Sequence, residues 1–312
     1  MVTNVTFAKK VHRESWTDQN KVTFEYGNCN ITISWIADTV TVQVPGGNDS
    51  KHDEITRGLW EMCFLYDGYF YKLESYSNDD CEQPLERLGC LDFYRSSVDV
   101  LRSAAPLCKS NREINARTFT TYMGLREGPR TNTTMWRELI HAFYYLCSDA
   151  YSKNLVDHRL SLLLNVCDGI HLNSCGNKGN VESGIKYVLS QVDIKLAKEG
   201  SEYLGVNKSS AYETLAAVRN ELDHYIPKRA SLGNQILEGK STNAIYLYFE
   251  YVLRVALRAT LLEQVGAAVD RNAVTVALQH IVDWAIISSD ADAKCYLPVN
   301  ELRRSLINRN NG

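Results

Sequence analysis

The sequence predicts an α+β protein, with a small mixed domain rich in β-strands over residues 1–132 and an all-helical bundle over residues 133–312. Two patterns of apolar residues predict this fold class. Early in the chain, apolar residues alternate with polar ones, which is the period of a half-buried strand. In the second half they recur every three or four residues, which is the period of an amphipathic helix. A length of 312 residues also favours two domains over one.

The first domain begins with a predicted antiparallel meander. Residues 21–26 form one strand candidate, and Gly27-Asn28 is a turn signal directly after it. Two further runs alternate apolar and polar side chains, and their apolar members are Ile31, Ile33 and Trp35, then Val40, Val42 and Val44. We expect one face of this sheet to contact solvent.

A helix over residues 53–66 is predicted to cover the sheet, because its apolar residues fall on one side. The aromatic run Tyr69, Phe70 and Tyr71, with Leu73 after it, then indicates a further strand. Such clusters stack nucleic acid bases in some proteins, but they more often belong to a core, and we interpret this one as core. Residues 124–132, rich in turn formers, are predicted to be the connector between the domains.

Helical periodicity continues through most of the second half, and proline and glycine lie mostly between the helical segments. The predicted helices span residues 135–149, 157–168, 181–198, 211–225, 243–265 and 273–287. This arrangement is typical of an α-helical bundle.

Composition narrows the class of protein. The net charge of −3 and the pI of about 6.2 argue against a protein that coats nucleic acid along its length, so contact with RNA would be local. The amino terminus lacks the apolar core of a signal peptide, and no run of about 18 apolar residues predicts a membrane span. Nine cysteines without Cys-x-x-Cys pairs suggest reduced thiols. We therefore expect a cytoplasmic protein.

The most informative motif lies near the end of the helix predicted over residues 211–225, and it reads Arg219-Asn220-Glu221-Leu222-Asp223-His224. Arginine grips phosphate oxygens through a rigid fork of donors. Histidine exchanges a proton near neutral pH. Together the two groups can cleave an RNA backbone without a metal, because histidine activates the ribose 2′-hydroxyl and arginine stabilises charge on the phosphate. The alternative reading is a solvated helix face or an Arg–His pair at a dimer interface.

Helix geometry bears on this mechanism. Residues five apart on an ideal helix are separated by about 140° around its axis. Leu215, Val218 and Leu222 define the expected buried face, Arg219 lies at its edge and His224 projects from nearly the opposite side. One helix therefore does not bring both groups onto one phosphate, whereas two helices related by a two-fold axis do.

The motif and its helical setting resemble the HEPN superfamily, whose nuclease members carry an arginine, a polar residue and then a histidine after four to six intervening positions. Arg219, Asn220 and His224 match this pattern. The segment 144–167 is similar to the ApeA-like branch, in which a separate amino-terminal domain precedes the HEPN module. Some members carry a tyrosine two positions after the histidine that receives a modifying group; this chain has Ile226 there, so such regulation is not expected.

The resemblance implies a metal-independent endoribonuclease that dimerises through its bundle and needs no cofactor. His224 would be the general base or acid, Arg219 would bind the scissile phosphate, and Asn220 would orient one of them. Lys228 and Arg229 would hold flanking phosphates, although solvated loop charges explain them equally well. The family also implies a role in phage defence by abortive infection or as a toxin, with a phage-derived trigger or an antitoxin as partner. The alternative is an inactive HEPN module that binds RNA or protein.

Other chemistry has less support. Cys167-x3-His171-x3-Cys175 contains metal-binding residue types, but a fourth ligand is not evident and the spacing is not that of a zinc finger. Phosphate loops, nucleophile elbows and His-Glu-x-x-His motifs are absent from the sequence. We therefore expect no metal site.

Overall fold

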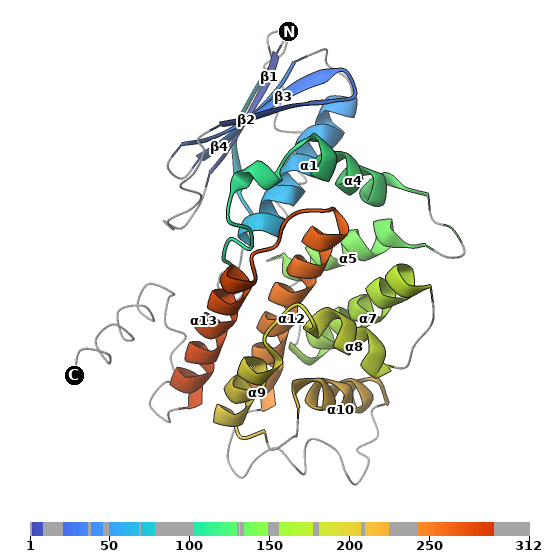
Figure 1. Cartoon of the computed structure of the whole chain (residues 1–312), viewed down its shortest axis with the longest axis vertical. Helices are drawn as coiled ribbons and strands as arrows, with labels where there is room; N and C mark the ends of the chain where they lie inside the picture. The colour runs from blue at the N-terminus through green and yellow to red at the C-terminus, as the bar shows by residue number, and fades with distance from the viewer. Residues whose placement is uncertain are drawn as a thin grey trace, which may run out of the picture. The chain divides into compact units, whose positions relative to one another are not determined.

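The computed structural model describes part of the chain, and of residues 220–224 it describes the backbone alone. The described residues are 2–8, 21–36, 39–45, 50–68, 70–78, 103–129, 131, 134–148, 156–176, 181–206, 210–224 and 242–289. They form the predicted α+β fold, with an antiparallel sheet followed mainly by helices (Figure 1).

The chain divides into two compact units. Unit 1 comprises Met1–Ser96, Ala105–Ala150 and Arg258–Ala273, and unit 2 comprises Ser97–Ala104, Tyr151–Leu257 and Val274–Gly312. These units follow spatial packing, so they cut the chain at other places than residue 132. The predicted division into a regulatory and a nuclease domain is one of function, and it stays a prediction.

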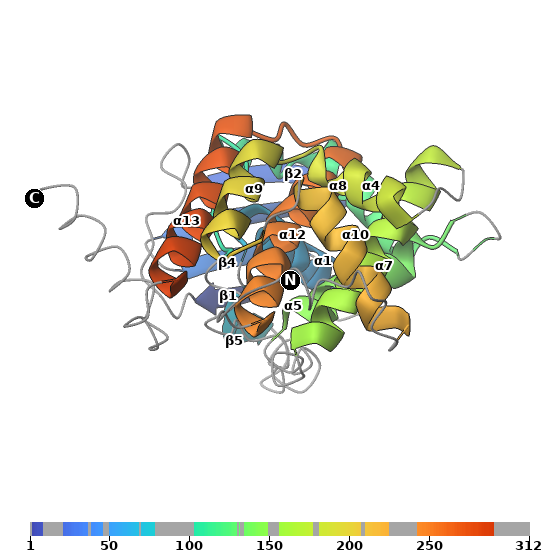
Figure 2. The ribbon, with the colours of Figure 1, turned by 90° about the horizontal axis from the view of Figure 1, so that it is seen from below.

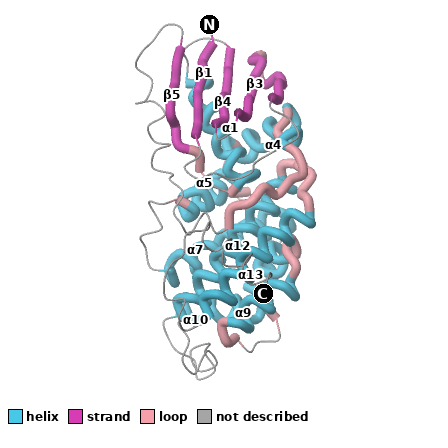
Figure 3. The backbone as a smooth tube through the Cα atoms, turned by 90° about the vertical axis from the view of Figure 1, so that its left-hand side faces the viewer, coloured by secondary structure: helices cyan, strands magenta, loops and turns pink. Residues whose placement is uncertain are grey.

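Unit 1 contains a five-stranded antiparallel sheet in the order β2-β3-β4-β1-β5. Figure 3 shows its strands side by side in magenta. Its strands are β1 (Val2–Ala8), β2 (Lys21–Tyr26), β3 (Cys29–Ile36), β4 (Thr39–Pro45) and β5 (Lys72–Asn78). The predicted turn joins β2 to β3, and Gly27 and Asn28 both take the positive φ that such a tight turn requires. The sequence pattern did not identify β1, and β5 begins after the aromatic run rather than within it.

One face of the sheet is buried, as the alternation predicted, because Ile31, Ile33, Val40 and Val42 are almost fully enclosed. Helix α1 (Ser50–Asp67) packs against β4 on this side. Phe70 stacks on Phe64 with ring centroids 4.0 Å apart, and Tyr71 is also buried. The interpretation of these two aromatic residues as core is confirmed; Tyr69 lies outside the described residues.

Two more helices complete the packing of unit 1, namely α4 (Ala116–Glu127) and α5 (Trp136–Cys147). Asn115 starts α4 with a capping box, since its side chain accepts from the amides of Arg117 and Thr118, and the Thr118 hydroxyl accepts from the Asn115 amide. The prediction of a connector over residues 124–132 is wrong for residues 124–127, which form the last turn of α4.

The helices that belong wholly to unit 2 lie close to the predicted segments. They are α7 (Val156–Cys175), α8 (Val181–Leu189), α9 (Ile194–Tyr203) and α10 (Ala211–His224). One predicted helix, over residues 181–198, is two helices, because Asp193 caps a new start by accepting from the amides of Lys195 and Leu196. Helix α7 continues seven residues beyond its predicted end at Asp168, so Gly169 does not interrupt it.

Two long helices run through both units along the chain, α12 (Thr242–Gln264) and α13 (Arg271–Ser289). Most of α12 is buried on all sides, including Glu250, Arg254 and Arg258. Within the described residues, no helix combines the length and apolar composition needed to cross a membrane.

Candidate functional site

The predicted motif lies on α10, which packs against α7, α8 and α9 in unit 2. Figure 2 shows α7, α8 and α10 from below. Leu215 and Val218 are fully buried, which confirms the predicted buried face at these two positions, while the side chain of Leu222 lies outside the described residues. Lys186 on α8 sits 4.6 Å from the ring centre of Tyr212 and adds a cation–π contact between α8 and α10.

Arg219 lies at the edge of this buried face, as helix geometry predicted, and 21% of its side chain is exposed. Its Nη2 atom is 3.6 Å from Oδ2 of Asp168 on α7. This distance makes an ion pair but is too long for a hydrogen bond. The guanidinium therefore pairs with this carboxylate by charge, and the Arg219 side chain stays partly exposed.

The other members of the motif are located less fully. Asn220 and His224 belong to α10, and His224 is the last residue of its described part, but their side chains lie outside the described residues. Lys228 and Arg229 lie outside them altogether. The structure therefore places Arg219 in its surroundings and leaves its meeting with His224 as a prediction.

Asp168 is the neighbour of the motif that sequence reasoning did not identify. It lies far from Arg219 in the chain, and it is the last residue of the helix predicted over residues 157–168. A close approach of two helices fixes its position. A Cβ atom on Gly184 of α8 would lie 2.8 Å from Cα and 2.5 Å from Oδ1 of Asp168, so only glycine permits this packing.

The three metal-binding residue types noted in the sequence, Cys167, His171 and Cys175, lie along one helix, α7. Cys167 is buried, and burial, with a smaller effect from Asp168, raises the pKa of its thiol well above the usual range. Cys175 is exposed, and His171 packs its ring edge against Tyr187 with centroids 5.6 Å apart. Among the described residues, no three histidine, cysteine or carboxylate side chains gather closely enough to hold a metal ion.

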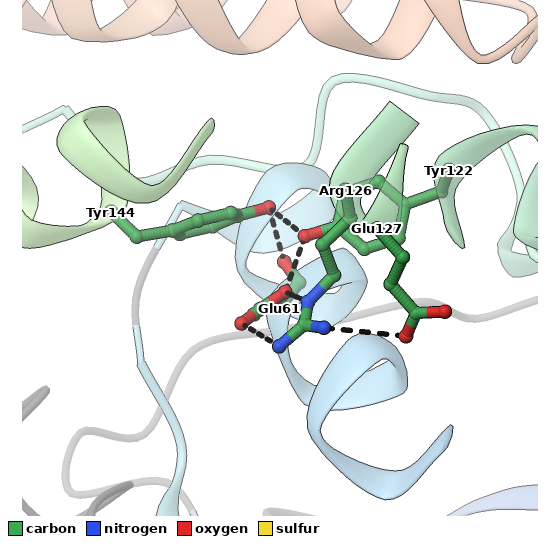
Figure 4. A network of polar contacts seen from close by, with 5 residues as sticks. All are labelled: Glu61, Tyr122, Arg126, Glu127 and Tyr144. Atoms are coloured by element: carbon green, nitrogen blue, oxygen red, sulfur yellow. Dashed lines mark hydrogen bonds and ion pairs between the residues drawn. The ribbon is translucent and has the colours of Figure 1, made fainter. Parts of the chain in front are cut away.

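A second polar cluster lies in unit 1, and the sequence analysis did not identify it either (Figure 4). Arg126 of α4 forms a two-point ion pair with Glu61 of α1, with Nε to Oε2 at 2.5 Å and Nη2 to Oε1 at 3.2 Å. Tyr122 donates to Glu61 at 2.6 Å, and the Tyr144 hydroxyl of α5 donates to the Glu61 carbonyl at 3.1 Å. This network ties α1, α4 and α5 together.

The cluster in unit 1 is structural in character. Glu61 and Arg126 are 6% and 7% exposed, and Tyr122 and Tyr144 are fully enclosed. Burial, reinforced by the Glu61 carboxylate, raises the pKa of both tyrosines well above the ordinary value. Both hydroxyls therefore stay protonated as donors throughout the physiological range.

A third network lies in unit 2, where Glu250 of α12 accepts from Arg159 of α7 at 3.2 and 2.9 Å and pairs with Arg254 one turn along α12. All three side chains are almost fully buried. This network fixes α7, the helix that carries Asp168, against α12.

Comparison with known proteins adds no relative. No family model, no curated protein and no solved structure matches this chain. The assignment to the HEPN superfamily therefore stays a prediction that depends on the motif and its helical setting.

Proposed function

We propose that this protein is a metal-independent endoribonuclease of the HEPN type. The observation that carries the proposal is the placement of Arg219: it lies on a well-packed helix, at the edge of the buried face, with its side chain partly exposed. A permanent cation held in this way is suited to binding a phosphodiester.

The proposed reaction is an intramolecular transfer within RNA. His224, as general base, removes the proton of the ribose 2′-hydroxyl, whose oxygen then attacks the adjacent phosphorus. The bond from phosphorus to the 5′-oxygen breaks, and that oxygen takes up a proton. Arg219 stabilises the charge that develops on the phosphate, and Asn220 orients the histidine or the phosphate. The products are a 2′,3′-cyclic phosphate and a 5′-hydroxyl.

The proposal includes a dimer, because Arg219 and His224 lie about 140° apart on one helix. Two chains related by a two-fold axis would lend one group each to a shared site. By analogy with the family, the nuclease would act in phage defence or as a toxin, with the amino-terminal domain restraining it until a trigger arrives. Lys228 and Arg229 would hold flanking phosphates.

The contact between Arg219 and Asp168 favours one second candidate, an inactive HEPN module that binds RNA or protein. In that case Arg219 would serve chiefly to pin α10 to α7. The two candidates differ in what His224 does, since a binding module has no need of a proton-transfer group.

The experiment that separates them incubates the purified full chain with total RNA and excess chelator. A nuclease cleaves the RNA, and both His224→Ala and Arg219→Ala abolish cleavage. His158→Ala and Lys195→Ala are matched controls, because both residues are exposed on other helices of unit 2, and they should leave cleavage unchanged. The inactive module is identified instead if the wild-type protein binds RNA without cutting it and the His224→Ala variant binds RNA with the same affinity.

A further inference from the structure

The ion pair at Arg219 differs from the buried pairs that Arg126 and Arg159 form. Arg126 meets Glu61 at two points, and Arg159 meets Glu250 at two points, all within hydrogen-bond distance. Asp168 and Arg219 are separated by 3.6 Å, with 33% and 21% of their side chains exposed. The first kind of pair fixes the orientation of a guanidinium, whereas the second contributes charge with little directional constraint.

The carboxylate in this loose pair is nevertheless held in place. Asp168 lies in the middle of α7, and α8 approaches its backbone so closely that a Cβ on Gly184 would lie 2.9 Å from the Asp168 nitrogen. Asp168 therefore cannot move far from the arginine, so any partner of Arg219 meets a negative charge beside it.

We propose that Asp168 is a built-in competitor of the substrate at Arg219. Its carboxylate holds the guanidinium in the free protein, and a phosphodiester of RNA must displace it to bind. The inference rests on the proposed role of Arg219 as the phosphate-binding group. It assigns a regulatory residue to the site, since the competing charge sets how much RNA is needed before the site is occupied.

The physical reason is repulsion between two anions at one cation. A phosphate that pairs with Arg219 comes within several ångströms of the Asp168 carboxylate. Because both groups remain partly in water, we expect the repulsion to weaken binding roughly fivefold at low salt. Salt screens such an interaction, so the effect should shrink as ionic strength rises.

The test measures binding of a single-stranded 2′-deoxyoligonucleotide by fluorescence anisotropy, because this probe lacks the attacking hydroxyl and is not cleaved. Asp168→Asn keeps the shape and removes the charge, and it should bind the probe roughly fivefold more tightly. Asp168→Ser guards against a folding defect specific to asparagine. Glu199→Gln, an exposed carboxylate on α9 of the same unit, is the matched control and should change affinity much less. Adding Arg219→Ala should abolish the gain.

Cleavage of RNA provides a second readout, in which Asp168→Asn lowers KM and leaves kcat unchanged. Unchanged or weaker probe binding by Asp168→Asn, or a gain that survives in the Arg219→Ala background, overturns the competitor role. If Arg219→Ala weakens binding and Asp168→Asn strengthens it, but no RNA is cut, the nuclease proposal fails and the competitor role stands. If Arg219→Ala leaves probe binding unchanged, both fail.

Discussion

Arg126 in unit 1 and Arg219 in unit 2 each face a carboxylate from another helix, but their surroundings differ. Arg126 and Glu61 are enclosed and joined at two points, with Tyr122 adding a third hydrogen bond to the same carboxylate. Arg219 and Asp168 meet at 3.6 Å and keep contact with water. Both pairs use the same chemical groups at the junction of packed helices.

The difference teaches what each pair is suited to do. Removing one member of a buried pair strongly destabilises the fold, because the other charge stays buried without a partner or solvent. The first pair is therefore suited to fixing helices. A partly exposed pair contributes about 0–1 kcal/mol and can exchange one partner for another anion. Ligand exchange at an arginine is what phosphate binding requires.

The largest expected effect comes from breaking the buried pair. Glu61→Gln removes the charge that compensates Arg126 and should reduce the free energy of unfolding by roughly 3–5 kcal/mol. Hydrogen exchange of peptides from α1 and α4 measures this loss locally. Glu127→Gln is the control, since Glu127 also pairs with Arg126, at 3.4 Å, but is exposed. Equal effects of the two substitutions would show that the enclosed pair has no special role.

The close packing of α7 and α8 predicts the next effect. Gly184→Ala introduces a Cβ that overlaps the Asp168 backbone and should destabilise the protein by about 1–3 kcal/mol in thermal or urea unfolding. Gly124→Ala on α4 is the matched control. Its Cβ would meet no atom within 4 Å, so the better helix propensity of alanine should stabilise by about 0.5–1 kcal/mol. Destabilisation by both would contradict the reading of Gly184.

The tyrosines of the buried network predict a pH dependence. The pKa of Tyr122 and that of Tyr144 are raised in the folded state, chiefly by burial, while the unfolded chain ionises near the ordinary value of 10.0. Their protonated form is therefore favoured by folding, so this contribution to stability is complete below pH 10 and is lost as the pH rises above it. Unfolding followed at rising alkaline pH should show the loss, and Tyr122→Phe should make the decline shallower. An unchanged slope would contradict the assignment.

The smallest expected effect is that of a substitution at the candidate site on the free energy of unfolding. Asp168→Asn should change the free energy of unfolding by less than about 1 kcal/mol, because the pair is loose and partly hydrated. Urea unfolding tests this beside Glu61→Gln. A loss comparable to that of Glu61→Gln would mean that Asp168 holds α7 to α10 and would remove the contrast between the two regions.

The fold class followed from sequence periodicity because burial imposes it. Ile31 and Ile33 face the core at alternate positions, and Leu215 and Val218 do so at helical spacing. The last turn of helix α4 was predicted to be a connector because Gly124, Gly128 and Pro129 resemble one, although Gly124 lies within the helix. Local composition does not reveal that tertiary packing stabilises such a segment.

The candidate site was predictable only in part. The position of Arg219 at the edge of the buried face of α10 follows from helix geometry, and the structure confirms it. Its neighbour Asp168 could not be found in this way, because their contact depends on how α7, α8 and α10 pack. The same holds for Glu61 and Arg126, which are distant in sequence and meet only in the folded unit.

The most direct test of the central claim, a site shared between two chains, mixes two inactive variants. If each site takes Arg219 from one chain and His224 from the other, a dimer of Arg219→Ala with His224→Ala has one site with both groups and one site with neither. Co-refolded mixtures of Arg219→Ala with His224→Ala should therefore regain about a quarter of wild-type RNA cleavage in chelator, because half the dimers are mixed and half their sites are intact. Wild-type protein that cleaves RNA while the mixture stays inactive would contradict the shared site, and wild-type protein that leaves RNA intact would contradict the nuclease itself.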